Sequence, residues 1–351
     1  MTLDQVLPNL QVPLSTLWLI ADIAESKGKQ ELFARQTPQM LKALRETALI
    51  QSVESSNRIE GVTVEAARLR PLVLGQAKPR DRSEEELSGY RQALNLIHTN
   101  AADLQIDPAL IQRLHQMIQA GSGDAGKWKS INNEIVELRP GHPPRIRFVP
   151  TTAAATPAAM NDLCLAYRHV IAQGLAHPLV AIATLVLDFL CIHPFRDGNG
   201  RVSRLLTMLA LYQNGYEVGR YIGLERLVEE AKDDYYESLR RSSEGWHEGQ
   251  NDLLPWLNCF LSVLRRAYRE LEKQANGTKS PRGAKTSLVE DAINSFAGEF
   301  TLEDLKRACP GVSQDLVRKV LRDLKEQGKV VSLGRGPGAT WKKSGNTPKR
   351  G

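Results

Sequence analysis

The sequence predicts a mainly α-helical fold with one β-hairpin and a small separate unit near its C-terminal end. Apolar residues recur at helical spacing over most of residues 1–274. Between residues 126 and 152 the spacing changes to two short extended runs around a Pro/Gly turn. A polar linker at 275–284, rich in helix-breaking residues, precedes a last stretch with short helices and strands.

Residues 1–107 are expected to form an N-terminal helical region, and residues 108–274 a helical core. Helices are expected at 14–24 and at 38–55, where Pro38 suits a first helical turn. Ser83 and the three glutamates after it mark another helix start, because Ser caps free N–H groups and acids favour the positive end of the helix dipole. Further helices are expected at 108–119 and from 157 to about 274.

The β-hairpin is expected within residues 127–149. Ile135 and Val136 lie in its first extended run, the turn follows at 139–144, and the second run covers 145–149. An ordinary surface hairpin is the alternative to a functional one.

The unit at 285–345 is expected to contain three helices followed by a second hairpin. The first helix is expected at 287–296, Thr301 caps the second, and Ser313 caps a third that runs to Gly328. Two strands at 329–333 and 339–341 then flank a glycine-rich segment at 334–338. This order resembles a winged helix-turn-helix module.

The net charge of +6 is unevenly distributed along the chain. From residue 276 to the end there are 15 Lys and Arg but 8 Asp and Glu, whereas the remainder carries a charge of −1. The asymmetry indicates an acidic partner for the C-terminal unit. Basic side chains of its third helix and wing could contact DNA phosphates: Arg318, Lys319, Arg322, Lys325 and Arg335. A protein-interaction or dimerisation module with a solvated basic face fits the same pattern.

Composition and cysteine usage indicate a globular protein of a reducing compartment. Apolar residues make up 42% and charged residues 25% of the chain, close to average globular usage. The four cysteines form no C-x-x-C pair and lie among apolar neighbours, which favours buried thiols over a zinc site. No signal-peptide pattern opens the chain, and no apolar run approaches the roughly 20 residues that span a bilayer. A cytoplasmic protein without a membrane partner is expected.

The run His193-Pro-Phe-Arg-Asp-Gly-Asn-Gly-Arg201 combines a base with an anion site. It follows the most apolar stretch of the chain, so His193 is expected at the end of a buried helix, where a neutral imidazole can accept a proton. Gly198 and Gly200 allow a tight turn before the next helix, whose first N–H groups can bind a phosphate.

Charged side chains complete this predicted phosphate site. Asp197 offers a hard oxygen ligand to Mg²⁺, which usually accompanies phosphates. Arg201 and Arg204 lie three residues apart on one face of the helix that follows, so both can reach the same anion.

The run matches the signature H-P-F-x-D/E-G-N-G-R of Fic proteins at every constrained position, and the chain resembles that family over about residues 3–272. The resemblance implies a protein adenylyltransferase, a nucleotidyltransferase that uses ATP and Mg²⁺ to place AMP on a Ser, Thr or Tyr hydroxyl of a target protein or of itself. It implies that His193 is the catalytic base and that Asp197 holds the metal. It assigns the α- and β-phosphates to Gly198, Asn199, Gly200 and Arg201, and the γ-phosphate to Arg204.

A second motif lies far upstream of the first. The string Ser56-Asn-Arg-Ile-Glu60-Gly61 resembles the inhibitory pattern [S/T]-x-x-x-E-[G/N] of Fic proteins that carry an inhibitory helix before the core. Glu60 can form a charge-assisted pair with Arg204, the same guanidinium that the γ-phosphate of ATP needs. The resemblance therefore implies that Ser56 and Glu60 keep the enzyme inactive.

Two further parts of the site follow from the resemblance. The hairpin at 127–149 lies where the family carries a flap that binds an extended target segment by strand addition. Residues 222–236 resemble the adenine-side helix, with Ala231 at a position where many relatives have Asn. Tyr235 is a candidate to pack on adenine, although it and Tyr236 could equally be core residues.

Two other functions fit the same residues. The protein could be a DNA-binding regulator in which the Fic site only senses nucleotide. It could also transfer UMP or a phosphoryl group with the same residues, although the intact Gly198-Asn-Gly200 favours AMP, because phosphotransfer relatives have a lysine in place of the second glycine.

Overall fold

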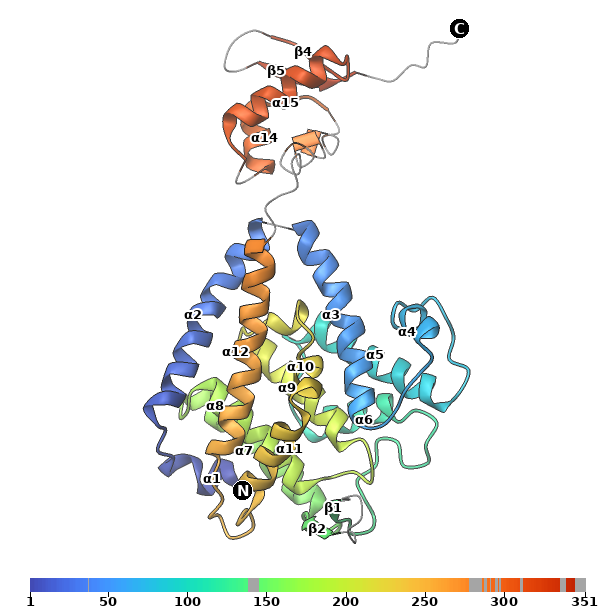
Figure 1. The fold of residues 1–351 in the computed structure, drawn as a ribbon, viewed down its shortest axis with the longest axis vertical. Coiled ribbons are helices and arrows are strands. Elements are labelled where there is room, and N and C mark those ends of the chain that lie inside the picture. The colour runs from blue at the N-terminus through green and yellow to red at the C-terminus, as the bar shows by residue number, and fades with distance from the viewer. Residues whose placement is uncertain are drawn as a thin grey trace. The chain divides into compact units, whose positions relative to one another are not determined.

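The computed structural model describes residues 1–36, 38–137, 145–277, 286, 289–290, 292–293, 296, 298–309, 312–334 and 339–344. The chain divides into two compact units (Figure 1). Unit 1 comprises Met1–Glu31 with Gln39–Glu272, and unit 2 comprises Leu32–Pro38 with Lys273–Gly351. The boundary expected at 107/108 lies inside unit 1 and stays a prediction.

The mainly α-helical fold expected from the sequence is confirmed. The helices that contribute to unit 1 are α1 (Thr2–Gln5), α2 (Leu14–Gln36), α3 (Pro38–Ile59), α4 (Ala66–Val73), α5 (Arg82–Asn100), α6 (Pro108–Ile118), α7 (Thr156–Gln173), α8 (Pro178–Ile192), α9 (Asn199–Gln213), α10 (Leu224–Glu230), α11 (Lys232–Ser243) and α12 (Leu254–Gly277). The helix expected at 14–24 continues to Gln36, and α4 was not expected from the sequence.

Helix α5 does not start at Ser83. Its N-cap is Asp81, whose carboxylate accepts a hydrogen bond from the N–H of Glu84 at 2.9 Å. Asp and Ser cap about equally well, and the extended backbone of Asp81 occupies the capping position two residues earlier. Ser83 therefore lies within the helix, and the sequence-based start was wrong.

Helix α8 is the centre of unit 1. Its residues are buried on nearly every face, as expected for a helix that is apolar all round. Pro178 occupies the first turn, and His177 Nδ1 accepts the N–H of Leu179 at 3.2 Å. Helices α1, α7, α9 and α11 pack against it, so the residue that follows α8 is held by the best-buried element of the fold.

A buried carboxylate attaches the N-terminal segment to α8. Asp188 accepts the backbone N–H groups of Thr2 at 2.9 Å and Leu3 at 3.0 Å, and the indole N–H of Trp246 at 2.6 Å. Asp188 thereby caps α1 from a different helix. Burial raises the pKa of Asp188 above its ordinary value.

The hairpin expected within 127–149 has two antiparallel strands, β1 (Ile135–Glu137) and β2 (Arg145–Phe148). Ile135 pairs with Phe148 and Val136 with Ile146, and the register shifts between Ile135 and Val136. The expected turn at 139–144 lies outside the described residues.

Unit 2 contains β3 (Phe300–Thr301), α14 (Leu302–Ala308), α15 (Gln314–Glu326), β4 (Val330–Ser332) and β5 (Thr340–Lys343). The strands form an antiparallel sheet in the order β3-β5-β4. Thr301 forms a capping box with Asp304, and Ser313 accepts the N–H of Leu316, so both expected caps are confirmed.

Some expected parts of unit 2 fall outside the described residues. Of the helix expected at 287–296, residues 289–290 and 292–293 are helical, and Val289 and Ile293 pack in the core of the unit. Arg335 and the rest of 335–338 are not among the described residues. The winged-helix assignment stays a prediction.

Within the described residues, no single helix is long and apolar enough to cross a membrane. One pair of helical segments, Thr2–Asn9 and Leu14–Gln30, meets the length and composition test only when taken together, and it is bent by 108°.

Candidate functional site

His193 ends α8 in a left-handed backbone conformation. Its φ is 51°, and it is the only non-glycine residue with a positive φ in the described part of the chain. Its backbone N–H donates to Phe189 O at 2.9 Å, which closes the last turn of the helix. The αL conformation turns the chain away from the helix axis at this residue.

The hydrogen bonding of His193 leaves one ring nitrogen free to act as a base. Nδ1 lies 3.2 Å from the carbonyl oxygen of Leu190, which can only accept, so Nδ1 carries the proton. The lone pair is then on Nε2. Burial, with a smaller effect from the charge of Lys129, lowers the pKa of His193 to about 4. The imidazole is therefore neutral near pH 7.

The loop between α8 and α9 is fixed by side chains that bond to its backbone. Asn199 accepts the N–H of Phe195 at 2.9 Å and donates to its carbonyl at 2.8 Å. Lys129 donates its backbone N–H to Pro194 O at 2.8 Å and its ammonium to Ile192 O at 3.1 Å. Burial lowers the pKa of Lys129 to about 8. The structure thus uses the side chain of Asn199 to hold the loop.

His115 on α6 packs against the same loop and bonds to its backbone. Its ring stacks on Phe195 with centroids 3.7 Å apart and planes 3° from parallel. Nδ1 accepts the N–H of Gly126 at 2.9 Å, so the proton is on Nε2, which donates to Asp197 O at 3.1 Å. Burial lowers the pKa of His115 to about 4, so this buried histidine is a neutral positioning residue.

Asp197 presents the one carboxylate of this loop. Oδ1 accepts the N–H of Gly198 at 2.7 Å, and Oδ2 accepts from Gln119 Nε2 at 2.9 Å and lies 3.6 Å from Arg201 Nη2. The side chain is 66% exposed. The described residues contain no group of three or more His, Cys, Asp or Glu that could hold a metal ion. A single exposed carboxylate suits Mg²⁺ that arrives with phosphates and keeps several waters.

Glycines shape the start of α9. Gly198 is its N-cap with φ 77°, a conformation that disfavours other residues. Gly200 has no such φ, but a Cβ on it would overlap Glu60 Oε1 and lie 3.2 Å from Arg204 Nη1. The positive end of α9 therefore approaches Glu60 without an intervening side chain.

Arg201 lies in the first turn of α9, and its side chain is buried. It is 1% exposed, and Nη1 donates to Glu86 Oε2 on α5 at 2.6 Å. Its buried Nε finds no partner among the described residues. The predicted phosphate ligand Arg201 is thus held by an internal ion pair in this structure.

Arg204 is bound on one side by the end of α3. Nε donates to Ser56 Oγ at 2.8 Å, and Nη2 donates to Ser56 O at 2.9 Å and to Glu60 Oε1 at 2.8 Å. Burial opposes the charge of Arg204, but the Glu60 carboxylate raises the pKa of this guanidinium above its ordinary value. The contact between Glu60 and Arg204 expected from the sequence is present.

These residues surround a pocket between the hairpin, α8, α9 and α11. Its wall includes His193, Gly200, Arg204 and Glu60. Tyr235 is 5% exposed and packs edge-on against Trp256, so it is a core residue that also lines the pocket. The other lining residues come from the hairpin, α8 and α11: Ile135, Arg147, Phe148, Leu187, Leu190, Cys191, Tyr236, Leu239 and Ser243.

Comparison with known proteins identifies the segment that contains this loop. Residues 105–211 match the model of the Fic/DOC family. The chain carries a Fic/DOC domain. The matched segment includes α6, the hairpin, α7, α8 and most of α9, while Ser56 and Glu60 lie before it.

Two curated relatives are similar to the chain. It is 26% identical over 236 residues to the protein adenylyltransferase Fic of Nematostella vectensis, which covers 65% of this chain and 49% of that protein. It is 34% identical over 98 residues to a Fido domain-containing protein of Dictyostelium discoideum, which covers 27% of this chain and 64% of that protein. The chain thus matches less than two thirds of the length of each.

Solved structures of Fic proteins share the fold of this chain. A Fic family protein from Desulfovibrio desulfuricans G20 has a TM-score of 0.63 and 21% identity, over 97% of this chain and 99% of its own. A Fic domain-containing signaling protein from Bacteroides thetaiotaomicron VPI-5482 has a TM-score of 0.62 and 24% identity, over 73% of this chain and 97% of its own.

The structure places five of the ten predicted site residues in the wall of one pocket and adds others that the sequence did not reveal. His193, Gly200, Arg204, Tyr235 and Glu60 line one pocket. His115, Gln119, Lys129 and Glu86 were missed, although each bonds to a signature residue or to the backbone beside one. None of the four belongs to a recognisable motif, so the sequence carries no signal for them.

Proposed function

We propose that the protein is an auto-inhibited adenylyltransferase that transfers AMP from ATP to a protein hydroxyl. The observation that carries this proposal is the bonding of Arg204 to Glu60 and Ser56 inside the pocket that also contains His193. A histidine with a free nitrogen and a guanidinium held by a carboxylate form a site for a base and an anion, with the anion position blocked. The curated relative named a protein adenylyltransferase supports this class of reaction.

In the proposed reaction, His193 Nε2 takes the proton of a Ser, Thr or Tyr hydroxyl. The hydroxyl oxygen forms a bond to the α-phosphorus of ATP, and the bond from that phosphorus to the β-phosphate oxygen breaks. Pyrophosphate leaves, and the target carries AMP. The neutral state of His193 near pH 7 prepares the base, because burial lowers its pKa to about 4.

The start of α9 is the proposed phosphate site. The backbone N–H groups of Asn199 and Gly200 and the positive end of the helix would bind the α- and β-phosphates, joined by the N–H of Gly198 once it leaves Asp197 Oδ1. Asp197 would hold Mg²⁺, which would neutralise charge on the leaving pyrophosphate when bound. The buried Arg201, held by its pair with Glu86, would add positive charge beside this phosphate site.

Glu60 supplies the proposed inhibition. The Glu60 carboxylate binds Arg204, which would otherwise bind the γ-phosphate. The same carboxylate also lies against Gly200. A triphosphate in this state lacks its terminal contact and meets a negative charge. Release of Glu60 would free both positions.

The hairpin is the proposed binding site for the target. Its strands expose apolar side chains, with Val136 43% and Ile146 51% exposed, and Ile135 and Phe148 line the pocket. An extended segment added to a strand of this hairpin would place a hydroxyl near His193. Tyr235 and Tyr236 line the same pocket and are the proposed contacts to adenine.

Transfer from labelled ATP tests the proposal. With α-³²P-ATP and Mg²⁺, Glu60→Gly is expected to raise self-modification by about five- to 150-fold, the usual range of a coupling between sites. His193→Ala in the Glu60→Gly background should abolish it. Intact-mass measurement should show a gain of one AMP.

Three results would overturn the AMP assignment. A gain of one phosphate would make the enzyme a phosphotransferase, and incorporation from UTP but not ATP would make it a UMP transferase. A Glu60→Gly protein that binds ATP but modifies neither itself nor any added protein would favour the nucleotide-sensor hypothesis.

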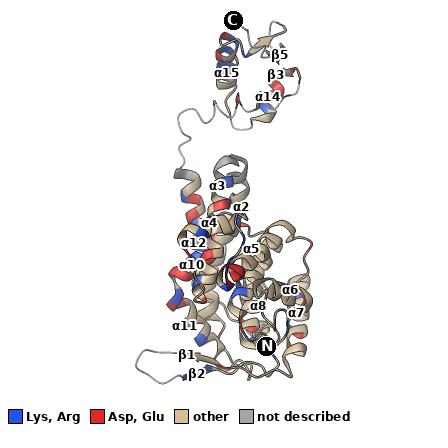
Figure 2. Cartoon of the chain, turned by 90° about the vertical axis from the view of Figure 1, so that its right-hand side faces the viewer, with Lys and Arg blue, Asp and Glu red and all other residues tan. Residues whose placement is uncertain are grey.

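Unit 2 supports a second candidate function, binding to DNA. Helix α15 buries Val317, Val320, Leu321 and Leu324 in the core of the unit. Its solvent side carries Arg318, Lys319, Arg322 and Lys325, which are exposed, and acidic residues lie beside them (Figure 2). Four exposed cations on one helix next to a small antiparallel sheet fit backbone contacts in a DNA groove.

The salt dependence of DNA binding tests this second function. The full chain is expected to bind a fluorescein-labelled duplex, with an affinity that falls as salt rises. Arg322→Ala should reduce the slope of log K against log[salt] by about one unit, the value for one phosphate contact. Lys42→Ala, which removes an exposed cation of unit 1, should leave the slope unchanged. Equal slopes for all three proteins would exclude α15 from the interface.

A further inference from the structure

The last turn of α3 is held from a buried side and from an exposed side. Ser56 and Ile59 lie on the buried side. Arg58 lies on the exposed side, with 47% of its side chain accessible. Glu60 follows directly after the end of α3, and its N–H donates to Asn57 O at 3.0 Å. The position of the Glu60 carboxylate therefore depends on how firmly this last turn is held.

An ion pair joins the exposed side of this turn to α10. Arg58 contacts both carboxylate oxygens of Glu229: Nη2 donates to Oε2 at 2.8 Å, and Nε donates to Oε1. A bidentate pair of this kind fixes the direction of the contact as well as its distance. Arg58 Nη1 also donates to Glu54 Oε1 at 3.1 Å, one turn earlier in α3. Lys232 at the start of α11 donates to Ile59 O at 3.3 Å, so the last turn is bonded to both α10 and α11.

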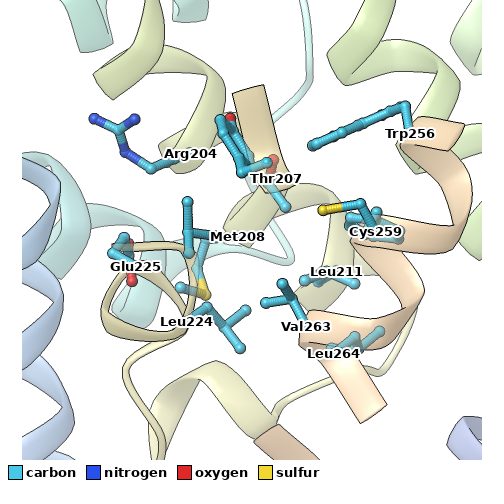
Figure 3. Close-up of a pocket in the computed structure, with 13 residues that line it drawn as sticks. Arg204, Thr207, Met208, Leu211, Leu224, Glu225, Trp256, Cys259, Val263 and Leu264 are labelled. Carbon is cyan, nitrogen blue, oxygen red and sulfur yellow. The ribbon is translucent and has the colours of Figure 1, made fainter. Parts of the chain in front are cut away.

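Helix α10 is itself fixed beside Arg204. Leu224 and Glu225 of α10 lie with Arg204 around a small, mostly apolar pocket (Figure 3). Both α10 residues are buried, and Glu225 Oε1 accepts the hydroxyl of Tyr90 on α5 at 2.9 Å. Glu229 lies one turn after Glu225 in the same helix, so this packing sets its position relative to Arg204. Arg58 is thus bonded to a partner that is held in place.

We propose that the Arg58–Glu229 ion pair is a latch that holds Glu60 in its inhibitory position. While the latch is closed, the last turn of α3 stays where Glu60 reaches Arg204. When the latch opens, Glu60 leaves and Arg204 becomes available to ATP. This inference rests on the proposed auto-inhibition and adds the surface contact that regulates it. Neither residue of the latch lines the pocket that contains His193, so both act through the position of Glu60.

The exposure of the latch sets its strength. The side chains of Arg58 and Glu229 are 47% and 21% exposed, so water and salt screen their attraction. An exposed ion pair usually changes an equilibrium by about 1.4- to fivefold. The buried Ile59 remains to hold the rest of the turn, so opening of the latch releases the end of α3 without unfolding the helix. The latch therefore responds to conditions at the protein surface.

Charge reversal in the full chain tests the latch by hydrogen exchange. The amides at 60–62 are bonded to carbonyls of the last turn of α3, so their exchange reports its opening without ATP. Arg58→Glu removes the pair and adds repulsion, and it should speed this exchange by about two- to tenfold. The double variant Arg58→Glu/Glu229→Arg restores an ion pair and should exchange as wild type does. Arg70→Glu makes the same charge change at the exposed pair with Glu46 in the middle of α3, and it should leave exchange at 60–62 unchanged.

AMP transfer provides the second measurement. Arg58→Glu should raise self-modification by the same two- to tenfold, and it should add nothing in the Glu60→Gly background, because the latch acts only through Glu60. Exchange at 60–62 that Arg58→Glu does not speed, or that the double variant does not restore, would overturn the latch. A gain in transfer that persists without Glu60 would overturn it as well. If exchange responds as expected while no variant transfers AMP, the latch holds the segment and the proposed function fails.

Discussion

The carboxylate of Glu60 lies directly against Gly200. A Cβ on Gly200 would overlap Glu60 Oε1 and come within 3.1 Å of its Cδ. Gly200 is in the first turn of α9 and has no positive φ. Its missing side chain is therefore required by the approach of Glu60 and not by the backbone.

The first prediction concerns this contact. Gly200→Ala should lower the free energy of unfolding by about 1.5–3 kcal/mol, because the methyl group would push the end of the Glu60 side chain off Arg204 and break a hydrogen bond between charged groups. In the Glu60→Gly background the same change should be neutral or stabilising by up to about 1 kcal/mol, since Ala favours a helix over Gly. Urea unfolding of the four proteins measures this double-mutant cycle.

Gly28→Ala provides the matched control for that cycle. Gly28 lies in α2, and a Cβ there would meet nothing within 4 Å. It should therefore give the same small gain in both backgrounds. If Gly200→Ala also had equal effects in both, the contact with Glu60 would not be what requires glycine.

The second prediction concerns the metal. Gln119 Nε2 donates to Asp197 Oδ2 at 2.9 Å, so it orients the one carboxylate proposed to hold Mg²⁺. Gln119→Leu should raise the Mg²⁺ concentration for half-maximal AMP transfer by about 10- to 100-fold, the usual effect of losing such a supporting bond. The measurement is a Mg²⁺ titration of the Glu60→Gly protein. An unchanged midpoint would mean that Asp197 needs no such support or holds no metal.

The third prediction concerns the pH dependence of transfer. Burial lowers the pKa of His193 to about 4, so the free base is present throughout the range from pH 5.5 to 8. The rate constant kcat/KM should then show no inflection near pH 6.5, the ordinary value for histidine, and should fall only toward pH 4. A rate profile that titrates near 6.5 would show that His193 is more hydrated than in this structure.

The fourth prediction concerns stability in acid. Burial lowers the pKa of His98, His115 and His193 to about 4. Between pH 4 and 6.5 the unfolded chain binds protons at these residues and the folded chain does not, so stability is complete above pH 6.5 and is lost as pH falls. Each histidine contributes up to about 1.4 kcal/mol per pH unit in that window.

Urea unfolding at half-unit steps of pH measures this slope. His115→Phe keeps a ring against Phe195 but cannot titrate, so its slope between pH 4 and 6.5 should be smaller than that of wild type. A slope that does not change would show that His115 already binds a proton in the folded chain.

The fifth prediction concerns the attachment of the N-terminal segment. Asp188→Ala removes the acceptor of three N–H groups, on Thr2, Leu3 and Trp246. It should lower the free energy of unfolding by about 3 kcal/mol or more, because each donor left without a partner costs about 1–3 kcal/mol. Asp252→Ala removes an exposed cap on Leu254 N and should cost only about 1 kcal/mol. Equal losses would show that water replaces Asp188.

The sequence was most informative where chemistry is concentrated in a short run. His193 and the two glycines lie within eight residues of one another, so their turn, helix start and base could be predicted together. Glu60 and Arg204 are 144 residues apart, and only the family pattern related them. The hairpin strands were predicted because their alternation and turn are local.

Contacts between lone residues could not be predicted in this way. Gln119 and His115 reach Asp197 across 78 and 82 residues, respectively, and neither belongs to a motif. The start of α5 was misplaced because Asp81 and Ser83 are both good caps, and only the backbone conformation decides between them.

The left-handed conformation of His193 has one more consequence. At a helix C-terminus this conformation is normally supplied by glycine, and any residue with a Cβ destabilises the fold there by roughly 1 kcal/mol. A screen for thermostability alone would thus favour His193→Gly, a change that also deletes the proposed base. Stability and the proposed activity make opposite demands on this position, so selection for the more stable chain alone would remove the proposed base.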